Sequence, residues 1–512
     1  MKRLFCFALS VIMTLPILVA CGENGNKQVD GKNSGVFSVG YGKADISPEH
    51  SVYLRGYGDP KTERMSTGVA EHLYATCVAI KDASGNQALL ISLDLLGCDT
   101  GVFRPIREQL AETTGVPFDS IMLCCSHSHT GPDMSDFVYR DLLEERLLTV
   151  AEEAMANLAP ATMEITFCRP EGINFVRHYL LLDGTYMGEK VGTIPKAQIY
   201  GHYGKADNLL QLIRFNREGD KPVILMNWQG HPMGPSPNSY TTATSNIAGI
   251  MRGTVEEALD CYASYFLGGS GNANNNSQIP TEVSYENYIE VGMALGQEVI
   301  KAAETFEPVN TDDIQVAVTY LNISGVEADA GAPYYAMSFG DVAFAFAPNE
   351  IFDTNAMAVR DNSKFKMTFY ASCSNESYGY LPTDPSFDWV HHYEVRITKY
   401  PKGTALVVQN MLSTLLDQCF EAGGNEELPK LEGYVTPEFI PYSNGIVYTN
   451  PSAGDTTAYT KVANGFCLFI MLEGSVSRSF LALNEEVVQE ILAQPTAKLL
   501  VNEQNVVVGI EK

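Results

Sequence analysis

Short apolar runs alternate with amphipathic stretches from Val36 to about Gly424. Apolar runs of strand length bounded by turn residues predict strands, and apolar residues recurring every three to four positions predict helices. The predicted strands are Tyr74–Ile80, Gln87–Asp94, Ser120–Cys125, Leu209–Phe215, Pro222–Asn227 and Asp341–Ala347. The predicted helices are Gly101–Thr114, Asp141–Leu158, Ile247–Leu259, Tyr285–Thr305 and Thr404–Phe420. This alternation predicts an α/β (mixed α+β) domain at residues 36–424, with mixed β-sheets flanked by helices.

The C-terminal segment, residues 428–512, has a different pattern. It is rich in β-branched residues and in Gly and Asn turns, with one short helical stretch near Asn484–Ala493. We therefore predict a small β-rich C-terminal module after the large domain.

The first residues have the pattern of an export signal. Lys2 and Arg3 precede an apolar stretch that ends in Leu-Val-Ala before Cys21. This pattern predicts a secretory signal peptide at residues 1–21, and the cysteine is typical of a bacterial lipobox, where acylation anchors the chain. Residues 22–35 are polar and predict a flexible tether. We expect an exported bacterial lipoprotein, held on a membrane at Cys21 in the periplasm or at the cell surface. The alternatives are an ordinary signal peptide or a short membrane anchor.

Charge and cysteine usage exclude several classes of protein. The formal net charge is -27, which argues against nucleic acid as a partner because phosphate binding needs a basic surface. It argues equally against electrostatic docking on anionic lipid. The nine cysteines beyond Cys21 are scattered, mostly in apolar runs, and none has C-x-x-C spacing. We expect them to be small buried apolar residues and not a disulfide framework or a sulfur metal site.

Three segments place metal-ligand side chains just after a predicted buried strand. They carry His127 with His129, then His231, then Glu350. Residues two apart on a strand share a face, and strand ends of an α/β sheet open onto the usual ligand crevice. Two imidazoles and a carboxylate suit a divalent metal, zinc first. Each signal alone is also compatible with a structural histidine or a carboxylate at a helix start.

Several segments together resemble the neutral/alkaline (non-lysosomal) ceramidase family. Ser126–Pro132 is similar to the family's T-H-T-H-S-G-P, and Gly42–Pro48 to its opening G-x-x-D-I-T-P. Further segments of the same kind are Leu54–Gly58, Asn227–Pro232, Ala347–Glu350 (with Asn349 in place of a glycine), Asn375–Thr383 and Tyr393-Glu394. They occur in the family's order and approximate spacing, which makes the resemblance specific.

The resemblance implies a zinc-dependent amide hydrolase that cleaves an N-acyl lipid or another N-acyl compound by zinc-activated water. It implies a single Zn²⁺ with four ligands, His127, His231, Glu350 and Tyr380. His129 would face the substrate and shuttle a proton to the leaving amine. The two expected oxyanion donors are Arg177 and Tyr393. Asp94 either orients a histidine or is simply a carboxylate at the start of a loop.

Two departures from the family touch the site. The first is Asn246, which stands where relatives usually carry an aspartate. The second concerns the nucleophile. Asn274 stands where the family has a serine that has been proposed as a nucleophile, and Ser270 and Ser277 are offset from that place. An amide is a poor nucleophile, so we predict direct attack by activated water, with Asn274 as a donor that orients the substrate. The alternatives are a lipid- or glycan-binding surface lipoprotein that has lost catalysis, and a zinc hydrolase of another bond, such as an ester.

Overall fold

The computed structural model describes residues 35–511 except for 58–63, 182–185, 189–198, 203–204, 234–240, 276–284, 322–330, 389–392, 427–428, 436–439 and short stretches between 443 and 505. The predicted signal peptide and nearly all of the predicted tether therefore lie outside the described residues. None of the helices in the described part of the chain has the length and apolar character that crossing a bilayer requires.

A mixed sheet carries the first two ligand segments. Its strand order is β12-β11-β10-β5-β1-β2-β3-β4, with β14 beside β5. The pairs β3–β4 and β11–β12 are parallel and the others are antiparallel. The strands are β1 (Ser38–Asp45), β2 (Tyr74–Lys81), β3 (Gln87–Leu93), β4 (Ile121–Cys125), β5 (Ala159–Cys168), β10 (Leu210–Arg217), β11 (Val223–Trp228), β12 (Tyr262–Leu267) and β14 (Glu307–Val309).

A second sheet, in the order β15-β16-β17-β19, leads into the third ligand segment. Its strands are β15 (Ile314–Leu321), β16 (Ala332–Phe339), β17 (Val342–Phe346) and β19 (Met367–Ala371). The long helices are α2 (Thr100–Thr114), α3 (Phe137–Ala156), α4 (Asn246–Leu259), α5 (Tyr288–Ala302), α6 (Asp353–Asn362) and α8 (Thr404–Ala422). Short 3₁₀ helices are η1 (Phe118–Ser120), η4 (Ala303–Thr305) and η5 (Asp384–Asp388).

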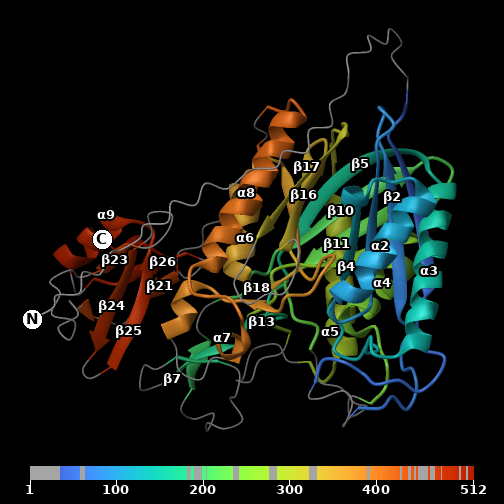
Figure 1. The fold of residues 1–512 in the computed structure, drawn as a ribbon. Coiled ribbons are helices and arrows are strands. Elements are labelled where there is room, and N and C mark those ends of the chain that lie inside the picture. Colours follow the sequence, from blue (N-terminus) through green and yellow to red (C-terminus); the bar gives the residue numbers. More distant parts are fainter. Residues whose placement is uncertain are drawn as a thin grey trace, which may run out of the picture. The chain divides into compact units, whose positions relative to one another are not determined.

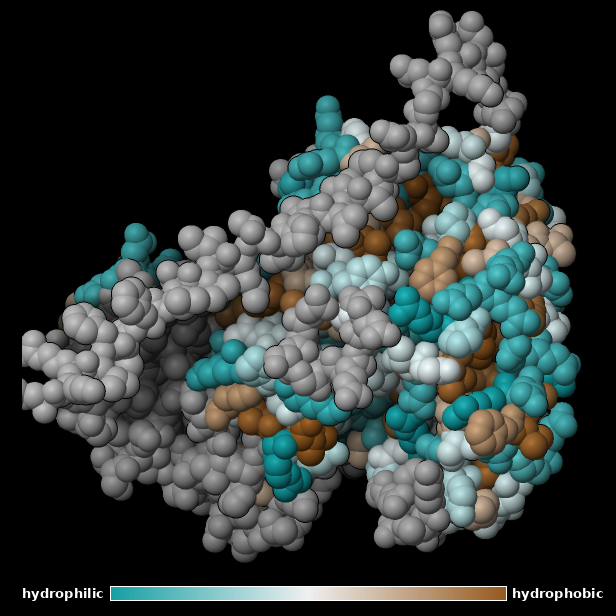
Figure 2. Space-filling model, viewed as in Figure 1, coloured by the Kyte–Doolittle hydropathy of each residue, from teal (hydrophilic) through white to brown (hydrophobic). Residues whose placement is uncertain are grey.

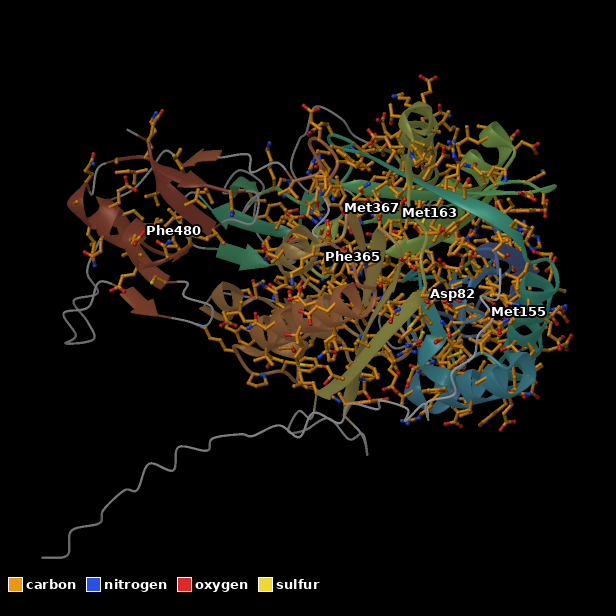
Figure 3. The ribbon with its side chains drawn as sticks, turned by 90° about the horizontal axis from the view of Figure 1, so that it is seen from above. Asp82, Met155, Met163, Phe365, Met367 and Phe480 are labelled. Carbon is orange, nitrogen blue, oxygen red and sulfur yellow. The ribbon has the colours of Figure 1, made fainter. Side chains whose placement is uncertain are left out.

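The large domain has four layers: one layer of helices, the first sheet, the second sheet and another layer of helices (Figure 1). Three apolar clusters hold successive layers together. The first cluster packs α2, α3, α4 and α5 on the outer face of the first sheet. The second lies between the two sheets and includes Met163 of β5 and Met367 of β19, which Figure 3 labels. The third packs α6 and α8 on the second sheet. Polar side chains cover much of the outer face over α2 and α3 (Figure 2). Burial of both faces explains why the strands have nearly continuous apolar runs.

The first sheet curls, which brings its distant strands together. In the strand order β11 and β4 are six places apart. Side chains of β1, β2 and β3 nevertheless bond to β12, as in the Ser264 to Thr76 hydroxyl contact of 2.8 Å. The segment after β19 then joins the two ends, because the Ser372 amide donates to Leu267 and the Asn375 amide donates to Leu123 (2.8 and 2.7 Å). The ends of β4 and β11 therefore meet at one place.

Residues 440–510 form a separate sheet with its own apolar core, which contains Phe480. Its strands are β21 (Ile440–Tyr442), β22 (Ile446–Val447), β23 (Tyr459–Lys461), β24 (Cys467–Glu473), β25 (Val476–Ala482), β26 (Leu499–Val501) and β27 (Val506–Ile510), and its helix is α9 (Glu485–Ala493). The strong β character predicted for the tail agrees with these elements. The domain boundary between residues 424 and 428 stays a prediction.

The predicted fold class is confirmed, with mixed sheets flanked by helices. Most predicted elements lie within one to three residues of the observed ones. Helix α3 begins at Phe137, four residues before the predicted start, because Asp136 caps it by accepting a 2.9 Å hydrogen bond from the Tyr139 amide. The expected burial of the cysteines also holds, since eight of the nine described cysteines are buried and all nine are free thiols.

Candidate metal-dependent active site

Three buried histidines meet at one point. The Nε2 atom of His231 lies 3.1 Å from Nε2 of His127 and 2.9 Å from Nε2 of His129. Exposed fractions are 4%, 7% and 0% for His127, His129 and His231. One ring nitrogen cannot form good hydrogen bonds to two others at once. The three nitrogens are therefore close enough for a cation to lie among them, bound by two or all three of the histidines.

The His127 backbone explains why His127 and His129 converge. Strand β4 ends at Cys125, so the two histidines follow the strand and strand alternation is the wrong explanation for their shared direction. His127 has φ of 65°, a left-handed conformation that is costly for a residue with a side chain. Its Nδ1 atom lies 2.7 Å from the Leu96 carbonyl oxygen, and the Ser126 and Ser128 amides bond to Leu93 and Leu95. These contacts hold the turn and aim Nε2 at the site.

Gly56 packs directly against His129. Its φ is 118°, and a Cβ atom there would lie 2.6 Å from the His129 Cα atom. Arg64 fixes the same segment from the other side, because its Nη2 atom donates to the His129 carbonyl oxygen at 2.9 Å. The position of His129 is thus set by backbone contacts and needs glycine at residue 56.

His231 is held by the loop that follows β12. Its amide donates to the Ala273 carbonyl at 2.7 Å, and the Asn275 side chain donates to the His231 carbonyl at 2.5 Å. Asn275 also accepts a bond from Trp228, and a Cβ atom on Gly230 would lie 2.2 Å from the Asn275 Oδ1 atom. The Gly230 position between Trp228 and His231 therefore has to be a glycine.

Glu350 and Tyr380 enter the site from a small parallel pair of strands. Glu350 starts β18 (Glu350–Ile351) and Tyr380 starts β20 (Tyr380–Leu381), with the two residues in register. The Glu350 Oε2 atom lies 3.1 Å from Nε2 of His127 and 4.0 Å from Nε2 of His231. Three of the four residues predicted as metal ligands, His127, His231 and Glu350, are therefore brought together with His129, and Tyr380 pairs with Glu350 beside them.

Arg177 is buried beside the site and is not a surface arginine. It follows β6 (Phe175–Val176), its guanidinium lies 5.3 Å from the Tyr380 ring centre, and its Nε atom donates to Glu394 at 2.6 Å. Glu394 is fully buried in α7 (Tyr393–Ile397) and also lies 3.3 Å from His178. Sequence reasoning assigned no role to Glu394. The signal that could have revealed it is its place in the Tyr393-Glu394 pair of the resemblance.

Tyr393 and Asn274 lie at the edge of the same group. The Tyr393 ring is 5.8 Å from the Tyr380 ring in an edge-on arrangement. Asn274 is in β13 (Ala273–Asn274), which pairs with β6, and it forms a bridge with His231. The Asn274 Oδ1 atom is buried and has no hydrogen-bond partner among the described residues. Ser270 contributes its carbonyl oxygen, 3.3 Å from Nδ1 of His231, and Ser277 lies outside the described residues.

Asp94 does not orient a histidine, so that reading of the residue is wrong. Its carboxylate binds the Arg252 guanidinium at 2.6 and 3.2 Å and accepts the Tyr74 amide at 2.9 Å. Both Asp94 and Arg252 are buried. The carboxylate at the end of β3 is used to pair a buried arginine of α4 and to hold the start of β2.

The electrostatics differ between the histidines. Burial lowers the pKa of His129 and His231 well below the usual range, and the charge of His127 adds to this. Burial also acts to lower the pKa of His127, but the interactions with Glu350 and Cys373 together outweigh it and leave that pKa well above its usual value. Burial, then the Glu350 charge, raises the pKa of Tyr380 well above its usual value. Neutral His129 and His231 are the forms that bind a metal or accept a proton.

The donor set fits a zinc ion. Two nitrogens each bound to zinc at tetrahedral angles are about 3.3–3.4 Å apart, close to the 3.1 Å between the Nε2 atoms of His127 and His231. The Glu350 Oε2 atom is buried without a hydrogen bond in the described part of the chain. A cation would satisfy this carboxylate and the converging imidazoles together.

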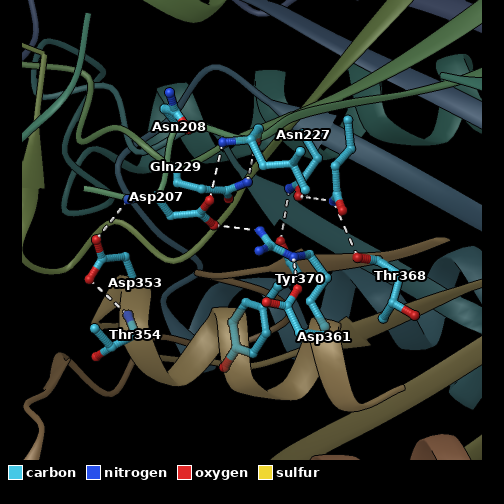
Figure 4. A network of polar contacts seen from close by, with 12 residues as sticks. Asp207, Asn208, Asn227, Gln229, Asp353, Thr354, Asp361, Thr368 and Tyr370 are labelled. Carbon is cyan, nitrogen blue, oxygen red and sulfur yellow. Dashed lines mark hydrogen bonds and ion pairs between the residues drawn. The ribbon is translucent and has the colours of Figure 1, made fainter. Parts of the chain in front are cut away.

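A network of polar contacts that includes Asp207 and Asp353 (Figure 4) is connected to the segments that carry the site. Asn272 and Asp353 bind each other twice, with 2.7 and 2.8 Å contacts between the loop after β12 and the start of α6. The Asp207 amide donates to Asp353, and the Asp207 carboxylate binds Arg360 at 2.5 Å. The Asn272 carbonyl accepts the Arg177 amide at 2.8 Å. The network thus ties the Asn274 loop, Arg177 and the helix after Glu350 into one unit.

Two solved structures are similar to this chain. One is a ceramidase complexed with C2, with a TM-score of 0.61 and 15% identity over 86% of this chain and 85% of that one. The other is the neutral ceramidase from Pseudomonas aeruginosa, with a TM-score of 0.62 and 14% identity over 86% of this chain and 84% of that one. No protein-family model and no curated protein sequence matches. At these identities the likeness concerns the fold, and the predicted ceramidase-like fold is confirmed.

Proposed function

We propose, from a fold shared with neutral ceramidases, that this chain is a zinc-dependent hydrolase of N-acyl amides, with an N-acyl lipid or related N-acyl compound as its substrate. The observation that carries the proposal is the convergence of His127, His129 and His231 with Glu350 in a buried site. The two similar structures support a hydrolase, and the name of one of them, a neutral ceramidase, supports an amide substrate.

In this proposal the metal is held by His127, His231, Glu350 and Tyr380. Zinc, when bound there, would act as a Lewis acid and make water available as a nucleophile near neutral pH. The low pKa of His129 keeps its imidazole neutral, so it can accept a proton and pass it to the leaving amine. Arg177, oriented by Glu394, and Tyr393 are suited to donate to the oxygen that becomes negative.

Metal content tests the proposal. We expect about one zinc per purified chain, and we expect His231→Ala to lose most of it because the site loses a ligand from its centre. His129→Ala should keep the metal and lose turnover. His72→Ala is the matched control, since His72 is exposed and pairs with Asp45 away from the site. Elemental analysis and hydrolysis of a panel of N-acyl amides and ester analogues provide the measurements.

Two outcomes would contradict the assignment. Folded wild-type protein that neither contains nor takes up zinc would rule out the metal site. If His129→Ala lost metal as completely as His231→Ala, the ligands would be the three histidines, and the proton-shuttle role of His129 would be wrong.

A second candidate function is a lipid- or glycan-binding protein without catalysis. Asn274 favours it, because that position lacks the hydroxyl carried by the family it resembles. Zinc binding without turnover of any amide or ester in the panel would make this second function the better one.

A further inference from the structure

A cavity of about 670 Å³ opens onto the proposed metal site. It is lined by Arg55, Leu96, Gly97, His127, Glu350, Ser377, Tyr378, Gly379, Ile397 and Lys399. Most of this lining is polar, and the carboxylate in it, Glu350, faces His127 at 3.1 Å. An apolar lining would suit an acyl chain, whereas this one suits the polar part of a substrate.

Lys399 is held in place at the cavity wall. The residue before it, Thr398, donates its hydroxyl to the Tyr380 carbonyl at 2.8 Å. The residue after it, Tyr400, is buried and accepts a 2.8 Å bond from Asn349. The backbone at Lys399 is thus fixed to the two segments that carry Tyr380 and Glu350. Lys399 itself is exposed, and none of the ion pairs in the described part of the chain involves it.

Arg55 is fixed on another wall of the same cavity. Its amide donates to the Gly131 carbonyl at 2.9 Å, just after the His127–His129 segment. Its Nη1 atom binds both carboxylate oxygens of Asp99 at 2.6 Å, and its side chain is 30% exposed. Asp99 does not line the cavity, so this pair orients the guanidinium while leaving it at the wall.

The cavity presents two basic side chains although the chain as a whole is acidic. The protein has 34 Lys and Arg against 61 Asp and Glu. Two cations nonetheless line the cavity. Asp99 offsets the charge of Arg55 but leaves its other N–H groups as donors, Glu350 faces the histidines, and Lys399 adds a positive charge. Partly enclosed cavities strengthen the field of the charges in their walls. An anion is therefore the ligand that this lining favours.

We propose that the cavity binds an anionic group on the amine part of the substrate, between Arg55 and Lys399, while the amide lies at the metal-site residues. The proposal rests on the hydrolase function above and deepens it. It names the substrate class as N-acyl compounds whose amine carries a carboxylate, sulfonate or phosphate close to the amide, such as N-acyl amino acids.

The test compares substrates that share one acyl chain, N-dodecanoylglycine and N-dodecanoyltaurine against neutral N-dodecanoylethanolamine. Wild-type kcat/KM should be at least about tenfold higher for the two anions. Lys399→Met should lower kcat/KM for the anions about tenfold more than for the neutral substrate. Lys399→Arg, which keeps the charge, should restore kcat/KM for the anions. Lys402→Met is the matched control, because it makes the same change in net charge three residues away, outside the cavity lining. Preference for the neutral substrate, or an equal effect of Lys402→Met, would overturn the proposal.

Binding separates this proposal from the hydrolase function. The probe is N-dodecanoylglycine on metal-stripped protein, so that its carboxylate cannot bind a metal. Binding by wild type that weakens about tenfold in Lys399→Met supports the anion site even if no amide is cleaved. Equal binding by wild type and Lys399→Met would refute the anion site even if the protein hydrolyses amides.

Discussion

Asn274 is the residue whose chemistry most affects the proposed reaction. Its amide cannot serve as the attacking group, but its backbone pairs with that of His231 and its buried Oδ1 atom has no partner among the described residues. We expect Asn274→Ala to lower kcat/KM by an amount equivalent to about 1–3 kcal/mol, as for one lost polar contact, without loss of zinc. Steady-state kinetics and elemental analysis of the same preparations measure both.

Because Asn274 cannot act as a nucleophile, we predict that activated water attacks the amide directly. A covalent acyl adduct trapped on wild-type protein would contradict this prediction. Asn275→Ala provides a contrast one residue away. Asn275 donates to the His231 carbonyl and accepts from the Trp228 ring nitrogen. Asn275→Ala should therefore lower the zinc content, whereas Asn274→Ala should leave it unchanged.

At the scale of elements, the contact between the loop after β12 and the start of α6 depends on a carboxylate. Burial raises the pKa of Asp353 to about 6 from a usual 3.8, and the nearby Asp207 charge adds to this. The folded chain therefore binds this proton more tightly than the unfolded chain. The contribution to the free energy of unfolding is greatest below about pH 4 and is lost as pH rises through about 6.

We expect Asp353→Asn to remove this pH dependence. Between pH 4.5 and 7 the wild-type free energy of unfolding should fall by about 2 kcal/mol more than that of the variant, from a shift of two pKa units. Urea unfolding of metal-stripped protein at the two pH values measures this. Exposed Asp312→Asn is the control and should follow wild type. Equal pH dependence in wild type and Asp353→Asn would show that the buried carboxylate does not titrate in this range.

At the scale of the whole molecule, residues after 424 pack into the core of the large domain. Tyr434 is buried in the apolar cluster between the two sheets, and its hydroxyl accepts the Thr368 amide at 3.1 Å. Arg169 also binds the Tyr434 carbonyl, at 3.0 Å. We expect a chain of residues 36–435 to fold and bind zinc. A chain of residues 36–424 should be less stable by about 3–5 kcal/mol, the cost of removing a large buried aromatic side chain.

Denaturant unfolding of the two truncated chains measures the difference, and Tyr434→Ala in the full chain should reproduce most of it. If the chain of residues 36–435 failed to fold, the C-terminal sheet would be part of the folding unit and the predicted module would not be separable.

Membrane attachment is the other property that belongs to the whole chain. We propose that acylated Cys21 anchors the protein, on the pattern of residues 1–21. Cys21→Ser should leave the protein unprocessed or release it from the membrane fraction, because the acyl chains supply the membrane affinity. Fractionation and mass spectrometry of the N-terminus measure this. Normal maturation with the Cys21→Ser protein still on membranes would exclude lipid attachment at this residue.

The sequence by itself determined which segments form helices and strands, because hydrophobic periodicity and turn residues are local properties. It also determined the chemistry available at the strand ends, through His127, His231 and Glu350. The order of the matching segments was enough to predict a ceramidase-like fold, although identity to the similar structures is only 14–15%.

Only the tertiary structure decided how these segments meet. β4 and β11 are far apart in the strand order, and the curl of the sheet that unites them depends on contacts between residues more than 100 positions apart, such as Ser264 and Thr76. The left-handed turn at His127 and the pairing of Arg177 with Glu394 have the same origin. The pairing of Asp94 with Arg252, and not with a histidine, also depends on tertiary packing. Tertiary packing determines which oppositely charged group pairs with a buried charge, so the partner cannot be predicted from a local sequence pattern.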